Sequence, residues 1–156
     1  MRQTGFTLIE LMATVVIIAL LATMVLPVAE ITIQRQREQD LRAALRQIRE
    51  AIDAYKLASD EGRIPRAADE SGYPPRLEVL ANGVVDPKTP DKRRIYFMRR
   101  LPRDPLATDP KLDAAATWGK RSYVSPPDNP SEGDDVFDVY SLSTGTGLNG
   151  IPYRQW

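Results

Sequence analysis

The sequence predicts an α+β fold, in which one long N-terminal α-helix packs on a small antiparallel β-sheet with loop-rich insertions. Three observations support this prediction. An apolar run over residues 11–29 passes directly into an amphipathic helical pattern that ends near Ser59. Prolines are dense in the middle of the chain, and β-rich runs follow only in its C-terminal part. The 156 residues suffice for one small globular domain in addition to the long helix.

Composition excludes several functions. The chain has 21 basic and 21 acidic residues, and this zero net charge does not favour nucleic acid as a partner. It has no cysteine, which excludes disulfides and thiol chemistry, and no histidine, the commonest general base and zinc ligand. Because paired-carboxylate and glycine-rich phosphate-binding signatures are also missing, the sequence predicts that this protein is not an enzyme.

The N-terminal apolar run is long enough to cross a membrane. At 1.5 Å per residue, about 19 helical residues span roughly 30 Å of hydrocarbon. A secretory signal peptide or signal anchor is the alternative, but its apolar region is typically about 7–15 residues long. Glu10 stands at the edge of the run, where a carboxylate costs on the order of 3 kcal/mol and usually marks function.

The heptapeptide Gly5-Phe6-Thr7-Leu8-Ile9-Glu10-Leu11 resembles the class III signal of type IV pilins and type II secretion pseudopilins. The resemblance implies that a prepilin peptidase removes residues 1–5 as a leader peptide and methylates the new N-terminus of Phe6. It also implies that Glu10 is an assembly residue, which meets the Phe6 amine of a neighbouring subunit in a filament. A buried amine and carboxylate would offset each other's desolvation. Pairing within one helix, between positions i and i+4, stays open.

Residues 6–29 are expected to form the transmembrane and filament-core helix. Pro27 removes the hydrogen bond to the carbonyl of Thr23, which predicts either a helix kink or the point of membrane exit. Arg2 on one side of the run and Arg35 and Arg37 on the other do not fix the orientation. The resemblance implies a single-pass protein of the inner membrane, with a cytoplasmic N-terminus and a periplasmic C-terminal domain.

Residues 30–62 are expected to form an amphipathic helix that continues the first. Its apolar positions alternate at spacings of four and three and form one stripe: Leu41, Leu45, Ile48, Ile52 and Tyr55. We interpret this stripe as the face on which the C-terminal domain packs. Gly62 is suited to the C′ position that ends the helix.

Residues 63–156 are expected to form the globular α+β domain. The pattern predicts a short second helix over residues 73–83, and an antiparallel pair of strands at residues 123–125 and 136–141 whose Phe137 and Val139 face the helix stripe. Basic residues over 88–103 surround residues 95–98. A buried segment is favoured there over a nucleic-acid groove.

Further landmarks resemble, in order, those of the major (G-type) pseudopilins of type II secretion: residues 60–63, 101–105, 118–119, 137–141 and Trp156. This implies a structural subunit of a pseudopilus, a homo-oligomeric helical filament that drives protein secretion. Implied partners are minor pseudopilins or pilins, prepilin peptidase and the inner-membrane assembly platform. The alternative is a type IV pilus pilin acting in adhesion, twitching motility or DNA uptake.

The resemblance also implies a calcium site formed by oxygens of the loop after residues 137–141. Calcium takes six to eight oxygen ligands, and carboxylates raise its affinity. Residues 142–156 contain neither Asp nor Glu, which departs from the family pattern. We therefore expect no cofactor or metal, with calcium at Asp138, Ser141, Ser143 and Asn149 as the alternative.

Overall fold

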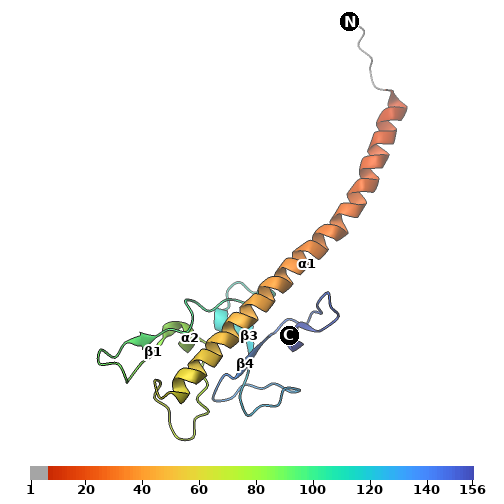
Figure 1. Cartoon of the computed structure of the whole chain (residues 1–156). Coiled ribbons are helices and arrows are strands. Elements are labelled where there is room, and N and C mark those ends of the chain that lie inside the picture. The colour runs from red at the N-terminus through yellow and green to blue at the C-terminus, as the bar shows by residue number, and fades with distance from the viewer. Residues whose placement is uncertain (1–6) are drawn as a thin grey trace. The chain divides into compact units, whose positions relative to one another are not determined.

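The computed structural model describes residues 7–156, apart from the side chains of residues 23–28 (Figure 1). It divides into two units, Met1–Gln36 and Arg37–Trp156. Helix α1, Leu8–Asp60, contributes to both. The predicted α+β fold is confirmed, because the second unit packs small antiparallel sheets against a long helix.

Helix α1 begins at a capping motif. The Thr7 hydroxyl accepts a hydrogen bond from the Glu10 amide at 3.3 Å, and the Thr7 carbonyl accepts one from the Leu11 amide at 3.1 Å. A threonine followed three residues later by a glutamate is the usual signature of a helix start. The predicted leader cleavage site at Gly5 and Phe6 lies outside the described residues.

The described N-terminal part of α1 exposes its large apolar side chains: Leu8, Ile9, Leu11, Met12, Val15, Val16, Ile17, Ile18, Leu20 and Leu21. A contiguous apolar surface of this kind marks contact with a membrane or with other proteins. Judged on residues 7–22 and 29–156, no helical segment is both long and apolar enough to cross a membrane. The expected span, residues 6–29, includes Phe6 and the side chains of residues 23–28, which lie outside the described part. The predicted kink at Pro27 lies there as well.

The predicted apolar stripe forms the core face of α1 in the second unit. Its five side chains are at most 6% exposed: Leu41, Leu45, Ile48, Ile52 and Tyr55. They belong to one core with buried residues from the loops and strands, among them Leu77, Leu80, Trp118 and Val139. The amphipathic pattern therefore predicted the correct packing face.

The end of α1 follows the glycine signal. Gly62 has φ of 68°, a left-handed conformation that glycine adopts without strain. Its amide donates to the Ser59 carbonyl at 2.9 Å, and the next amide, of Arg63, donates to the Ala58 carbonyl at 2.9 Å. This pair of bonds is the Schellman motif, which satisfies the last carbonyls of a helix. The prediction for Gly62 is confirmed.

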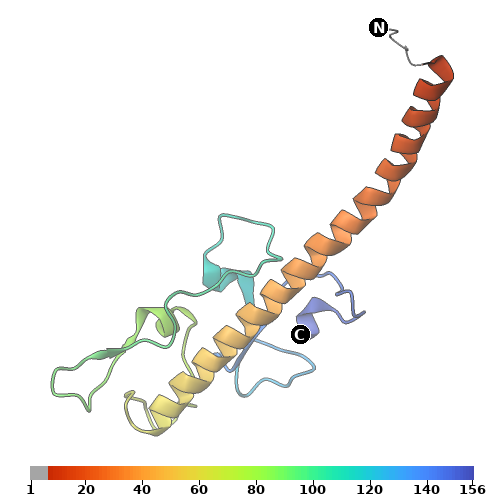
Figure 2. The same cartoon turned by 45° about the horizontal axis from the view of Figure 1, so that its top comes forward.

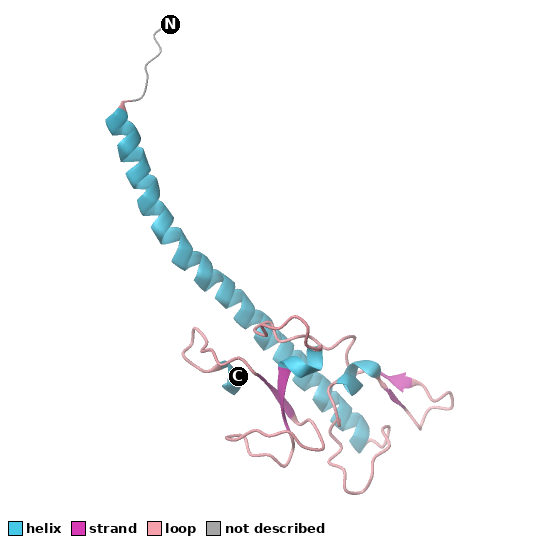
Figure 3. Cartoon of the chain, turned by 180° about the vertical axis from the view of Figure 1, so that it is seen from behind, coloured by secondary structure: helices cyan, strands magenta, loops and turns pink. Residues whose placement is uncertain are grey.

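Two small sheets flank α1. Strand β1, Val84–Val85, pairs with β2, Arg94–Ile95, and β3, Trp118–Arg121, pairs with β4, Asp138–Ser141, both antiparallel. In the second pair Trp118 is opposite Ser141 and Arg121 is opposite Asp138. Figures 1 and 2 show β1 on one side of α1 and the C-terminus on the other. Figure 3 shows that most of the remaining domain is loop.

Helix α2, Glu78–Asn82, is shorter than the predicted helix over residues 73–83. It begins only after Pro74 and Pro75 and ends at Gly83, whose φ is 74°. The apolar positions of that prediction are nonetheless buried, because Leu77 and Leu80 are both 0% exposed. Two short 3-10 helices, Ala114–Thr117 and Tyr153–Gln155, complete the elements of the described chain.

The predicted strand at residues 123–125 is wrong, since β3 ends at Arg121 and residues 123–125 form a turn. The Tyr123 amide donates to the carboxylate of Asp135 at 2.8 Å, and the Ser125 amide donates to the Ser122 carbonyl at 3.0 Å. These local bonds compete with strand pairing, an effect that β-propensity does not capture.

Aromatic packing explains why Phe137 does not face the helix stripe as predicted. The ring of Tyr123 stacks on Tyr73 at 5.5 Å, and both contact Phe137, at 5.6 and 5.0 Å. Val139 is fully buried on the α1 stripe as predicted, whereas Phe137 is only partly buried, in this aromatic cluster.

A pair of leucine substitutions on α1 tests the packing face. Leu45→Ala should lower the free energy of unfolding by about 2–5 kcal/mol, because it opens a cavity beneath a side chain that is 2% exposed. Leu57→Ala is the matched control; its side chain is 61% exposed, so the change should stay within about 0.5 kcal/mol. Urea unfolding of the full chain in detergent measures both, and equal losses would contradict the assigned core.

Candidate functional site

Of the N-terminal site residues, the structure describes Glu10. It lies in the first turn of α1 and is exposed in the isolated chain. A carboxylate in the first turn interacts favourably with the positive end of the helix dipole. Glu10 is therefore compatible with the helix and available to a partner.

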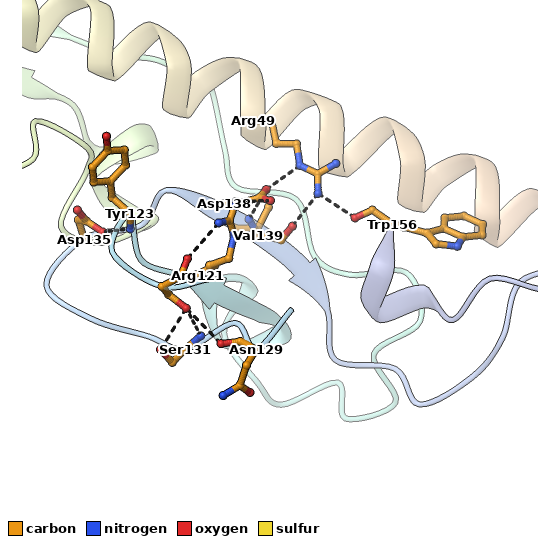
Figure 4. A network of polar contacts seen from close by, with 10 residues as sticks. Arg49, Arg121, Tyr123, Asn129, Ser131, Asp135, Asp138, Val139 and Trp156 are labelled. Atoms are coloured by element: carbon orange, nitrogen blue, oxygen red, sulfur yellow. Dashed lines mark hydrogen bonds and ion pairs between the residues drawn. The ribbon is translucent and has the colours of Figure 1, made fainter. Parts of the chain in front are cut away.

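Several polar contacts join α1 to β4 and to the C-terminal segment, which we define as residues 142–156. Arg49 is central to these contacts (Figure 4). Its Nε donates to Asp138 Oδ1 at 2.8 Å, while its Nη2 donates to the backbone carbonyls of Val139 at 3.1 Å and Trp156 at 2.8 Å. One guanidinium thus joins α1, β4 and the last residue.

Asp138, a residue of the alternative calcium site, is held between two arginines. Besides Arg49, its carboxylate forms an ion pair with Arg121 at 3.5 Å. Two guanidinium groups beside one carboxylate repel any added cation. Asp138 therefore connects β4 to α1 through these ion pairs.

The other oxygens of that alternative site have local partners. The Ser141 hydroxyl is 0% exposed and donates to Asp104 Oδ2 at 2.6 Å. Ser143 Oγ accepts from the Gly145 amide at 3.3 Å, and Asn149 Oδ1 accepts from the Ile151 amide at 3.0 Å. Across the residues that the structure describes, no group of three or more acidic side chains is arranged to hold a metal ion.

Glu38 is a site residue that the sequence reasoning missed. Its side chain is buried, at 3% exposure, and Oε1 accepts hydrogen bonds from the Leu148 amide at 2.8 Å and the Tyr153 hydroxyl at 3.0 Å. Its Oε2 lies 3.9 Å from Arg42. The signal was its spacing: Glu38 precedes Leu41 by three residues and so continues the apolar stripe with an acid.

The proline-containing landmark at residues 101–105 also connects to the sheet. Asp104 is 3% exposed, its carboxylate also accepts from the Leu106 amide at 2.7 Å, and its own amide donates to Thr117 Oγ1 at 3.1 Å. The indole Nε1 of Trp118 donates to the Pro102 carbonyl at 2.9 Å. These landmark residues therefore hold loops together rather than forming a reactive centre.

Asp135 organises the turn after β3. Its carboxylate accepts from the Ser122 hydroxyl at 2.7 Å, the Tyr123 amide at 2.8 Å and the Ser71 hydroxyl. Burial by itself raises the pKa of Asp135, but the hydrogen bonds from Ser71, Tyr123 and Ser122 outweigh burial and hold the pKa below its ordinary value.

The prediction of a buried segment over residues 95–98 holds only in part, because Met98 alone among the four is buried. Met98 is 7% exposed, and the ring of Phe97 packs on Tyr55 of α1 at 5.2 Å. Tyr96, by contrast, is 62% exposed. The guanidinium of Arg103 donates to backbone carbonyls of Leu112 and Asp109, the latter at 2.8 Å.

Comparisons with known proteins identify similar sequences along most of the chain. The family model described as the prokaryotic N-terminal methylation motif matches residues 1–26. The type II secretion system core protein G of Dickeya chrysanthemi is 30% identical over 154 residues, which cover 96% of this chain and 94% of that protein. The protein of the same name from Pectobacterium carotovorum is 31% identical and covers 86% of this chain and 83% of its own length. That from Vibrio cholerae is 32% identical and covers 90% of this chain and 80% of its own length. No solved structure matches.

Removing the guanidinium of Arg49 tests its role at the C-terminal segment. Arg49→Gln should lower the free energy of unfolding by about 1–3 kcal/mol, because a carboxylate and two carbonyls lose a charged donor. Arg46→Gln, at an exposed position on the same helix, is the control and should change stability by less than about 0.5 kcal/mol. If urea unfolding gives the same midpoint for both variants, the assigned role of Arg49 is wrong.

The lowered pKa of Asp135 predicts a pH effect. Its hydrogen bonds contribute stability that is present above the carboxyl's unfolded-state pKa and is lost as the pH falls through the lower, folded-state pKa. Asp135→Asn should therefore flatten the loss of stability below about pH 4. Asp134→Asn, an exposed neighbour, should keep the wild-type slope. Urea unfolding at a series of pH values measures the difference.

Proposed function

We infer that this chain polymerises into a helical filament that drives protein secretion. The chain belongs to the family of type II secretion system core protein G and is a structural subunit of a type II secretion pseudopilus. The observation that carries this function is the extent of the similarity, which runs from the methylation motif through the C-terminal domain. The relatives favour the pseudopilus over a type IV pilus pilin.

Processing is the first step of the proposed role. Prepilin peptidase would cut between Gly5 and Phe6 and methylate the new amine. Thr7, which caps α1, would then be the second residue of the mature chain, so the helix would begin almost at the amine. A positive group at the N-terminus of a helix opposes the helix dipole, and a nearby carboxylate relieves that conflict.

Assembly through Glu10 is the second step. Glu10 is the only charged residue between Thr7 and Ala29, and large apolar side chains surround it along α1. When those side chains are buried among neighbouring subunits, the carboxylate requires a positive partner. The Phe6 amine of a neighbouring subunit supplies that charge, so pairing selects the register in which one subunit adds to the next.

The location and partners follow from the same segment. Residues 6–29 would hold the subunit in the inner membrane before assembly, with the N-terminus cytoplasmic and residues 63–156 periplasmic. A helical filament requires a heterologous contact repeated between identical subunits. The proposed partners are further copies of this chain, minor pseudopilins, prepilin peptidase and the inner-membrane assembly platform. The role is structural and includes no catalytic step.

Substitution of Glu10 tests the proposed assembly. Glu10→Ala should be processed and inserted, yet filament yield should fall by at least about tenfold, because an unpaired buried amine costs on the order of 3 kcal/mol. Secretion should fall with it. Mass spectrometry of the N-terminus reports cleavage and methylation, and electron microscopy of sheared filaments reports the yield.

Glu30→Ala is the control for this experiment, since it removes an exposed carboxylate from the same helix outside the apolar run. It should assemble normally. Wild-type filament yield from Glu10→Ala would refute the assembly role, whereas an N-terminus other than methylated Phe6 in the wild-type chain would refute the proposed processing.

A further inference from the structure

The buried carboxylate of Glu38 reaches from α1 into the C-terminal segment. Two donors from this segment contact its Oε1, the Leu148 amide at 2.8 Å and the Tyr153 hydroxyl at 3.0 Å. A segment built around a calcium ion turns oxygen acceptors toward the centre. Here, donors from the segment point toward an anion, so the polarity of this contact is the reverse of that in a calcium site.

Several carbonyls of the segment are engaged within it. The carbonyl of Gly145 accepts from the Tyr153 amide at 3.1 Å, that of Gly147 from the Gly150 amide at 2.9 Å, and that of Ile151 from the Gly147 amide at 2.9 Å. The indole of Trp156 also donates to Ile151, at 3.2 Å. These bonds form the turns of the segment, and a calcium ion would have to compete for the same oxygens.

Positive groups from α1 hold the end of the segment. Arg49 donates to the Trp156 carbonyl at 2.8 Å, and the guanidinium of Arg42 lies 4.3 Å from the centre of the Trp156 ring. The rings of Tyr153 and Trp156 meet edge to face, with centroids 5.0 Å apart. The surroundings of the segment therefore already contain two cations.

We propose that Glu38 takes the organising role of the calcium ion that the resemblance implies, so that the C-terminal segment is held to α1 by a buried anion and the domain folds without calcium. Four observations agree on this point: the buried position of Glu38, the donors that face it, the engaged carbonyls of the segment and the arginines beside Asp138.

The first test uses the wild-type full chain in detergent. Its melting temperature should change by less than about 2 °C between excess EDTA and millimolar calcium chloride, because only a ligand that binds the folded state would raise it. Calorimetric titration with calcium should show no saturable binding. A calcium-dependent rise, or saturable binding, would overturn the proposal.

The second test removes the contact between Glu38 and the C-terminal segment. Glu38→Ala should lower the melting temperature by about 5–15 °C, and millimolar calcium should not restore it. Glu50→Ala, the same substitution at an exposed position of α1, should leave it within about 2 °C of wild type. Equal melting temperatures for the two variants, or recovery with calcium, would refute the role of Glu38.

Tyr153→Phe is a milder variant that tests the same contact if Glu38→Ala does not fold. It removes one donor to Glu38 and should lower the melting temperature by about 2–6 °C, again without recovery in calcium. No change would contradict the proposal. All these measurements use the unassembled chain, so their failure would leave the filament role intact, and failure of filament assembly would leave this inference intact.

Discussion

The apolar stripe of α1 is the contact on which the rest of the domain depends. Both sheets have two strands, and the longest strand has four residues. Sheets of this size are marginal by themselves in water. They gain their stability by burying residues such as Trp118 and Val139 against the stripe. The helix is thus the structural centre of the domain as well as its link to the N-terminal segment.

Polar contacts then fix the loops that the stripe alone cannot order. Arg49 ties β4 and the last residue to α1, Glu38 ties the C-terminal segment to the same helix, and Asp104 ties the proline-containing loop to β4 through Ser141. Each is a charged group with several partners, and hydrogen bonds to charged groups are stronger than those between neutral groups. A domain rich in loops therefore acquires defined geometry from charged side chains such as these, to which Asp135 adds the turn after β3.

The sequence predicted what periodicity and local signals determine. The helix stripe from Leu41 to Tyr55, the stop at Gly62 and the strand at residues 138–141 follow from spacing or from intrinsic preference. That strand is two residues shorter than the predicted 136–141. The predicted strand at residues 123–125 was wrong because the Tyr123 amide donates to the carboxylate of Asp135, twelve residues away, instead of to a neighbouring strand. Glu38 and Arg49 were missed as site residues for a similar reason, because they bond to groups far along the chain. Leu148 is 110 residues from Glu38, and Asp138 and Trp156 are 89 and 107 residues from Arg49.

These distant pairings have a kinetic consequence. Contacts between groups separated by about 110 residues form late, because a long loop must close before they contribute. The polar contacts of Glu38 and Arg49 on α1 therefore become complete only when residues 142–156 are in place. If the domain is delivered across a membrane N-terminal part first, a fully closed subunit exists only after delivery has finished.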